Sequence, residues 1–153
     1  MRTNIRVAGI IFHEGKLVTA RQNKGEKIYD VLPGGGVEDY ESVEDAIKRE
    51  LKEELTIDIT RLRLAYIKEF NVKSKGRVIE LYFYVEEYEG DIKKGLFDPK
   101  IKLSEFENVY YAELNELNNF IFYPEQLIDI IEKDKKDNFN EVKHLGLHEY
   151  PEV

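Results

Sequence analysis

Alternating apolar and polar positions predict β-strands along much of the chain. The strongest pattern covers residues 77–88, where an apolar side chain occupies every second position from Ile79 to Val85. A turn at Glu14-Gly15 separates the first two strand patterns and predicts a hairpin. The predicted strands are residues 5–12, 16–21, 29–32, 57–70, 77–88 and 108–112.

Residues 43–55 carry the period of a helix instead. Ile47, Leu51 and Leu55 recur every four residues and form a narrow apolar stripe. Ser42 comes directly before this segment, and serine is a favourable N-cap because its hydroxyl accepts a free backbone N–H. The pattern therefore predicts an amphipathic helix whose apolar stripe faces the core.

The end of the chain has weaker patterns. A second helix is predicted to begin at Pro124, with an apolar face over residues 127–131 and a frayed end over residues 132–137. Residues 139–153 show no period and are expected to form an irregular C-terminal tail. The elements together predict one domain over residues 1–153. Its expected class is α+β, a mixed β-sheet flanked by helices in an α/β/α sandwich.

The composition is that of an ordinary globular domain, with 42% hydrophobic and 35% charged residues among 153. No apolar run approaches the roughly 20 residues that cross a bilayer, so we expect no membrane partner and a cytoplasmic location. The chain has no cysteine, which excludes disulfides, thiolate metal sites and cysteine nucleophiles. The net charge of −8 argues against a long nucleic acid as the main ligand. A divalent cation can still bridge carboxylates to a small phosphorylated molecule.

Three consecutive glycines, residues 34–36, lead into the first predicted helix. Glycines before a helix let backbone N–H groups approach an anion closely. The helix then presents Glu50, Glu53 and Glu54 on one face, and carboxylate oxygens are the ligands that Mg²⁺ prefers. Taken alone, the same residues are also typical of a tight turn before a solvated acidic face, which is the more frequent arrangement.

The spacing of these residues resembles the Nudix box. That box is a glycine, five residues, Glu, seven residues, Arg-Glu-aliphatic, one residue, Glu-Glu, one residue, and Gly-aliphatic. Thr56 stands where the family has the glycine that ends the helix, and we expect it to alter the C-cap geometry rather than the chemistry. Eight of the nine defined positions match, and they are Gly35, Glu41, Arg49, Glu50, Leu51, Glu53, Glu54 and Ile57.

The resemblance implies a Nudix pyrophosphohydrolase, in which water attacks phosphorus and Mg²⁺ or Mn²⁺ neutralises a diphosphate. By the same resemblance, Arg49 is expected to pair with Glu41 and to hold the carboxylates in place. Gly34 and Gly36 are expected to support the loop. The implied metal ligands are Glu50, Glu53, Glu54 and the carbonyl of Gly35.

The general base stays open, because family members take it either from the box or from a later loop. Glu54 and Glu50 are the candidates within the box. Glu105, close to Glu107, is the candidate in the later loop. Arg49 completes the expected catalytic set.

The expected substrate is a small nucleotide, either a nucleoside triphosphate or a nucleoside diphosphate linked to another group. Arg21, Lys27 and Tyr29 precede the box and are the candidates to contact it through charge and base stacking. The alternatives are a non-catalytic nucleotide-sensing module of the same fold, an ADP-sugar hydrolase and an RNA 5′-end pyrophosphohydrolase. A homodimer is a further expectation, since many relatives are dimers.

Overall fold

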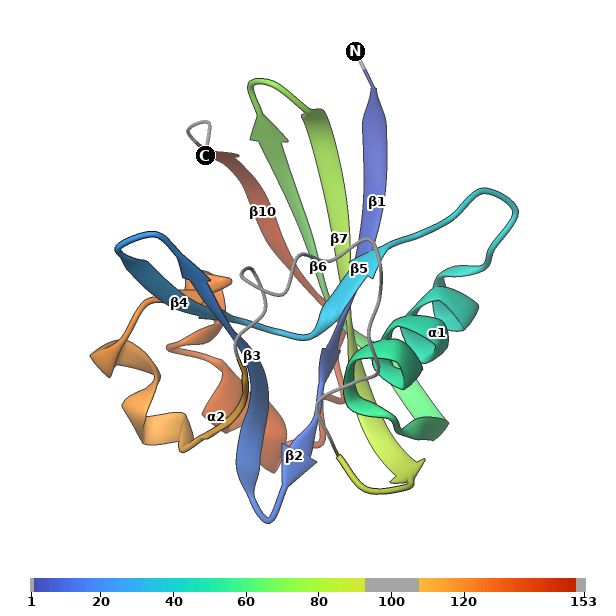
Figure 1. Cartoon of the computed structure of the whole chain (residues 1–153), viewed down its shortest axis with the longest axis vertical. Coiled ribbons are helices and arrows are strands. Elements are labelled where there is room, and N and C mark those ends of the chain that lie inside the picture. Colours follow the sequence, from blue (N-terminus) through green and yellow to red (C-terminus); the bar gives the residue numbers. More distant parts are fainter. Residues whose placement is uncertain (1, 93–107, 151–153) are drawn as a thin grey trace.

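Two β-sheets form the centre of the computed structural model, which describes residues 2–92 and 108–150 (Figure 1). Sheet A has five strands in the order β10-β6-β7-β1-β5. The β1–β7 and β10–β6 pairs are parallel, whereas the β6–β7 and β1–β5 pairs are antiparallel, so the sheet is mixed. Its strands are β1 (Thr3–Ile10), β5 (Gly34–Gly36), β6 (Asp58–Val72), β7 (Gly76–Glu89) and β10 (Lys143–Tyr150).

Sheet B is smaller and is built around β3. Its main path runs in the order β2-β3-β4-β9, and β8 also pairs with β3. The β4–β9 pair is parallel, and the other pairs are antiparallel. The strands are β2 (Phe12–His13), β3 (Lys16–Lys24), β4 (Lys27–Val31), β8 (Asn108–Ala112) and β9 (Phe122–Tyr123).

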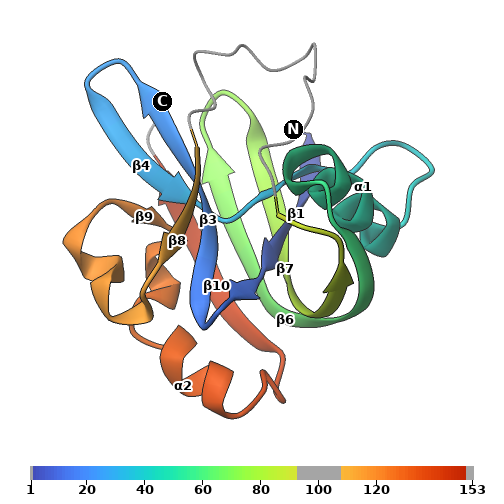
Figure 2. The ribbon, with the colours of Figure 1, turned by 60° about the horizontal axis from the view of Figure 1, so that its bottom comes forward.

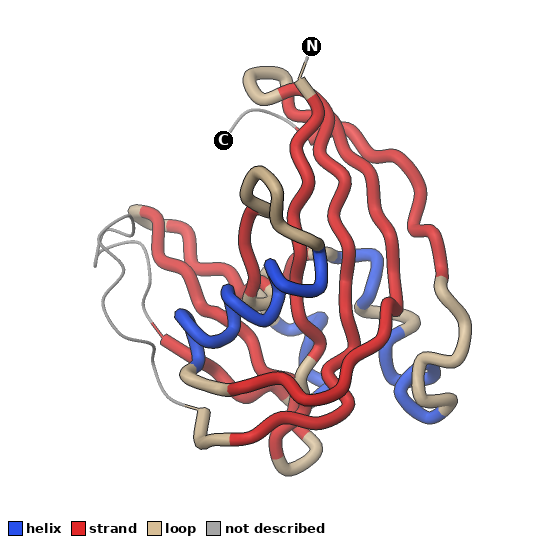
Figure 3. The backbone as a smooth tube through the Cα atoms, turned by 90° about the vertical axis from the view of Figure 1, so that its right-hand side faces the viewer, coloured by secondary structure: helices blue, strands red, loops and turns tan. Residues whose placement is uncertain are grey.

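Helices lie on opposite sides of sheet A. Helix α1 (Val43–Leu55) crosses one face of it (Figure 3), while α2 (Ile131–Lys136) and the short 3₁₀ helices lie on the other side, next to sheet B (Figure 2). The 3₁₀ helices are η1 (Leu114–Asn119) and η2 (Glu125–Leu127). Among the described residues, no helix is long and apolar enough to cross a membrane.

Each face of sheet A buries its own apolar cluster. Under α1, the predicted stripe of Ile47, Leu51 and Leu55 packs against Val7 and Phe83 of the sheet. Between sheet A and sheet B the cluster is larger and contains buried aromatic rings. Among its members are Tyr66, Tyr82, Phe122, Leu127, Ile131 and Phe139. The expected α+β class is confirmed, and the helix of residues 43–55 has the predicted bounds. That the whole chain is one domain stays a prediction.

The predicted hairpin of residues 5–12 and 16–21 is wrong in part. The first run divides at Ile11, so that β1 joins sheet A and only the short β2 pairs with β3. The turn at Glu14-Gly15 is where it was expected, with positive φ at both residues. Local alternation predicts a strand but does not say which partner it takes, and β1 takes β7, a strand more than 60 residues away.

Two predictions for the end of the chain are wrong. Helix α2 begins at Ile131, because residues 125–127 form a separate 3₁₀ turn and the segment expected to fray is the helix itself. The expected irregular tail contains β10, which pairs in parallel with β6 at the edge of sheet A. Gly146 interrupts β10 with a φ of +92°, and the register shifts between His144 and Leu147. That bulge hides the alternation that would have indicated a strand.

The ends of α1 are well capped. The hydroxyl of Ser42 accepts the N–H of Asp45 at 3.0 Å. At the other end Thr56 adopts the left-handed conformation, with φ 62° and ψ 26°, and its N–H donates to the carbonyl of Lys52. Thr56 therefore takes the backbone geometry that a glycine cap takes, and the expected change of geometry is wrong. Its hydroxyl donates to the carbonyl of Asp91 at 3.0 Å, which offsets the strain.

We predict that Thr56→Val will be less stable than Thr56→Gly by about 1–2 kcal/mol. Valine keeps the strain of a side chain in the left-handed region, about 1–2 kcal/mol. Both changes lose the hydrogen bond to Asp91, which contributes about 1 kcal/mol. Urea unfolding of the three proteins measures the difference. Equal stabilities of the two variants would mean that Thr56 is not strained.

Candidate active site

The glycines before α1 lie in a narrow space. In β5, Gly34 pairs with Ala8 and Gly35 pairs with Val7 of β1. A side chain on Gly34 would place its Cβ 2.0 Å from the carbonyl oxygen of Val7. One on Gly35 would meet the carboxylate of Glu50 at 2.4 Å. Glycine is thus needed at position 34 because the backbone of β1 occupies the space of a side chain, and at position 35 because the carboxylate of Glu50 occupies it.

Arg49 joins the loop to the helix. Its guanidinium donates to both oxygens of Glu41, at 2.8 and 2.9 Å, and to the carbonyl of Gly36 at 3.0 Å. It also donates to Glu50 at 2.9 Å and lies 3.7 Å from Glu53. The paired guanidinium, with help from a backbone N–H, lowers the pKa of Glu41 to about 2. The structure therefore brings Arg49 and Glu41 together, as the resemblance to the Nudix family implied.

Glu50 and Glu54 carry more negative charge than the site neutralises. Burial is the main cause that raises the pKa of Glu54 to about 8, and the nearby carboxylate of Glu50 adds to it. The N–H of Gly34, which donates to Glu54 at 3.2 Å, acts in the opposite direction. Burial also raises the pKa of Glu50, although Arg49 opposes this effect. Two like charges in a partly enclosed space favour protonation or a bound cation.

The available donors fit a hard divalent cation in type and in charge. Glu50, Glu53 and Glu54 offer carboxylate oxygens from one face of α1, and Gly35 lies against Glu50. Within residues 2–92 and 108–150, no three acidic or histidine side chains are already gathered into a metal-binding cluster. The contacts explain this, because Arg49 holds Glu50 and reaches Glu53, while Glu54 accepts from Gly34.

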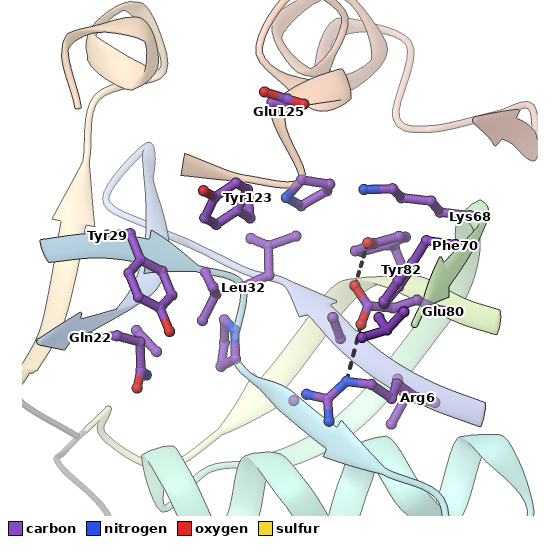
Figure 4. A pocket seen from close by; sticks show the side chains of 18 of the residues that line it. Arg6, Gln22, Tyr29, Leu32, Lys68, Phe70, Glu80, Tyr82, Tyr123 and Glu125 are labelled. Atoms are coloured by element: carbon purple, nitrogen blue, oxygen red, sulfur yellow. Dashed lines mark hydrogen bonds and ion pairs between the residues drawn. The ribbon is translucent and has the colours of Figure 1, made fainter. Parts of the chain in front are cut away.

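A pocket of about 910 Å³ extends from Glu54 between the two sheets. Glu54 and Gly34 line one end of it. One wall carries Tyr29 and Tyr123, whose rings meet edge to face at 5.7 Å (Figure 4). The side chain of Lys27 lies beside both rings and donates to the hydroxyl of Tyr123 at 3.1 Å. The pocket therefore joins the acidic face to a wall that suits a planar base.

Two of the three residues predicted to contact the substrate line this pocket. Tyr29 and Lys27 line the pocket, but Arg21 lies outside it. Arg21 pairs with the buried Asp30 at 2.6 Å and stacks on Tyr110 at 3.8 Å. Strand alternation explains this placement, because the neighbours of Arg21 in β3, Ala20 and Gln22, line the pocket and Arg21 faces away from it. Glu105 and Glu107 lie outside the described residues.

Several polar residues that line the pocket were missed from the sequence. Arg6 of β1, Glu80 of β7 and Lys68 of β6 lie next to one another across sheet A, since Glu80 pairs with each of the other two. All three sit at strand positions that an amphipathic pattern assigns to solvent. In the sequence, the one sign of a polar site at these positions is Glu80, a charged residue within the strongest strand pattern. Only the pairing of distant strands shows that these charges meet.

Comparisons with known proteins agree with this geometry. The family model described as NUDIX domain matches residues 2–143. The chain belongs to the Nudix family.

Two curated relatives extend this result. An 8-oxo-dGTP diphosphatase of Buchnera aphidicola is 31% identical over 132 residues, which cover 79% of this chain and 97% of that protein. An ADP-ribose pyrophosphatase of Methanocaldococcus jannaschii is 31% identical over 126 residues, covering 81% of this chain and 70% of that protein. The expectation of a Nudix pyrophosphohydrolase is confirmed at the level of the family.

Solved structures confirm the Nudix fold. The E. coli ORF135 protein superposes with a TM-score of 0.72 at 21% identity, covering 92% of this chain and 96% of that one. A MutT NUDIX hydrolase from Burkholderia pseudomallei gives a TM-score of 0.68 at 18% identity, covering 84% of this chain and 96% of that one. At these identities the likeness concerns the fold alone.

We predict that alanine will have three different effects in the glycine run of the Nudix box. Gly34→Ala should cost about 3 kcal/mol or more, because its Cβ overlaps the backbone of β1. Gly35→Ala should cost about 1 kcal/mol or less, yet lower divalent-cation affinity about 10-fold by displacing the carboxylate of Glu50. Gly36→Ala is the matched control, since nothing lies within 4 Å of its added Cβ.

Urea unfolding and calorimetric titration with Mg²⁺ measure these two quantities separately. Equal effects of Gly35→Ala and Gly36→Ala on cation affinity would contradict the close fit of Gly35 against Glu50.

Proposed function

We propose that this protein hydrolyses the diphosphate linkage of a small nucleotide by attack of water on phosphorus, with Mg²⁺ or Mn²⁺ as its cofactor. The observation that carries the proposal is the position of Glu54. It belongs to the acidic face of α1 and also lines the pocket that holds the aromatic wall. A nucleoside against Tyr29 therefore has its phosphates beside the carboxylates.

The cation-binding residues are Glu50, Glu53 and Glu54, with the carbonyl of Gly35. When bound, a divalent cation neutralises the diphosphate and makes phosphorus more open to attack. Arg49 keeps Glu50 oriented and ties it to the loop through Glu41. This fixed geometry lowers the cost of assembling the reacting groups.

Glu54 is the best placed of the described residues to take a proton from the attacking water. It lines the pocket, and a cation bound beside it would favour the ionised carboxylate, which is the form that can accept a proton. Glu50 is less available, since Arg49 donates to it. Glu105 remains the candidate from the later loop, and replacement of each of the three residues distinguishes them.

The substrate class follows from the pocket and from the relatives. A small nucleotide fits a space of about 910 Å³, and the two curated relatives are named for a nucleoside triphosphate and for ADP-ribose. We therefore propose a nucleoside triphosphate or a nucleoside diphosphate linked to a second group. An RNA 5′ end is less favoured, because the net charge of −8 repels a long polyanion. A homodimer and a cytoplasmic location stay predictions.

We predict that Glu53→Gln will lower turnover about 100-fold or more while the protein stays folded. The Glu53 side chain is 44% exposed, so its replacement leaves the core intact. Glu44→Gln is the matched control, because it removes the same charge from the exposed first turn of α1. A panel of nucleotides with Mg²⁺, with products identified by chromatography, measures turnover.

Full activity of Glu53→Gln would contradict the assignment of the acidic face. Tight nucleotide binding with no product after long incubation of the wild type would favour the nucleotide-sensing alternative.

A further inference from the structure

Arg6 lies in the central part of sheet A, next to the glycine strand β5, and borders the pocket. It lies in β1, where it pairs with Gly36 of β5 on one side and Glu80 of β7 on the other. Its side chain lines the pocket (Figure 4). Arg6 therefore borders the same pocket as Glu54 of the acidic face and Tyr29 of the aromatic wall.

The guanidinium of Arg6 is held from one side only. Its Nε donates to Oε2 of Glu80 at 3.2 Å. The other oxygen of Glu80 accepts the hydroxyl of Tyr82, a side chain that is 1% exposed. Lys68 stands opposite Glu80 in the next strand. Glu80 is thus held by the phenol of Tyr82, which also lines the pocket, and it holds Arg6 in turn.

Arg6 has two further donor groups, Nη1 and Nη2. Neither Nη1 nor Nη2 donates to a residue within the described part of the chain, and the side chain is 48% exposed. The charge of Arg6 also reaches the acidic face, where burial raises the pKa of Glu50 and Glu54 and Arg6 lowers it. Arg6 is therefore a cation with free donors at the boundary between both parts of the site.

We propose that Arg6 binds the phosphate that stays attached to the nucleoside, with Glu80 and Tyr82 as positioning residues. The inference rests on the proposed function for the orientation of the nucleotide along the pocket. Two parallel N–H groups of a guanidinium match two oxygens of a phosphate, and this geometry is stronger and more selective than a point charge.

A plain surface ion pair between Arg6 and Glu80 is the competing explanation. Such pairs contribute little to stability and do not need a fixed geometry. Here the acceptor is held by a buried hydroxyl, and only Nε of the arginine is used. That arrangement leaves Nη1 and Nη2 of Arg6 available for an anion. An ion pair that served stability alone would be expected to use these donors as well.

The test is nucleotide binding in the absence of metal. Adenosine and AMP, and guanosine and GMP, are titrated calorimetrically into the protein in EDTA. For at least one base, we expect the wild type to bind the monophosphate about 10-fold more tightly than its nucleoside, as expected for one charge-assisted bidentate contact. Arg6→Gln should remove this preference, and Arg6→Lys should keep part of it.

Arg77→Gln is the matched control. It removes the same charge from the same sheet. Arg77 lies three positions before Glu80 in β7, so strand alternation places it on the opposite face, away from the pocket. The Arg77→Gln protein should prefer the monophosphate to the same degree as the wild type. Thermal unfolding of each variant checks that it is folded.

Three results would overturn the inference: a wild type with no preference for the monophosphate, a preference that survives in Arg6→Gln, or an equal loss in Arg77→Gln. The hydrolysis assay is independent of these titrations. A preference that depends on Arg6 without any hydrolysis would contradict the proposed function alone. Hydrolysis without the preference would contradict the inference alone.

Discussion

The contacts of Arg49 are the constraint on which the rest of the site depends. One guanidinium binds Glu41 and the carbonyl of Gly36 on the loop, and Glu50 on the helix. These contacts fix the glycine loop against α1. The guanidinium of Arg49 alone cannot balance the charges of Glu41, Glu50 and Glu54 when all three carboxyl groups are ionised, so ionising Glu54 creates a surplus of negative charge. Burial makes that surplus costly and raises the pKa of Glu54 to about 8.

The surplus charge links the fold to the chemistry. Sheet A supports α1 from below through Leu51 and Leu55, and β5 brings the glycines against the same helix. Glu54 of this helix also lines the pocket between the two sheets. Under the proposed function, an anionic substrate would meet the carboxylates of α1, so positive charge is needed between them. A divalent ion would supply it on the helix side, and Arg6 would supply it on the pocket side.

Local patterns explain which parts were predictable from the sequence. The bounds of α1 follow from Ser42 and a regular apolar stripe, and both are contained within one short segment. The pairing of Arg49 with Glu41 was implied by the resemblance of this segment to the Nudix box. These features depend on residues close together in the chain, and for that reason the sequence was sufficient.

The features that were missed depend on pairing between distant strands. Arg21 was assigned to the substrate because alternation does not say which face of β3 meets the pocket. Arg6 and Glu80 meet only because β1 and β7 are parallel partners in a particular register. The strand β10 was hidden by the bulge at Gly146. A register is a property of the assembled sheet, and a single sequence does not contain it in readable form.

The most direct test of the surplus charge is the proton released when the metal binds. Mg²⁺ is titrated calorimetrically into metal-free protein at pH 7, in two buffers of different ionisation enthalpy. Because the pKa of Glu54 is raised to about 8, its carboxyl is mostly protonated at pH 7, and a bound cation favours the ionised form. The predicted result is release of about one proton per cation, which disappears in Glu54→Gln and in the wild type above pH 9. Equal heats in the two buffers at pH 7, or no binding of Mg²⁺, would contradict the account.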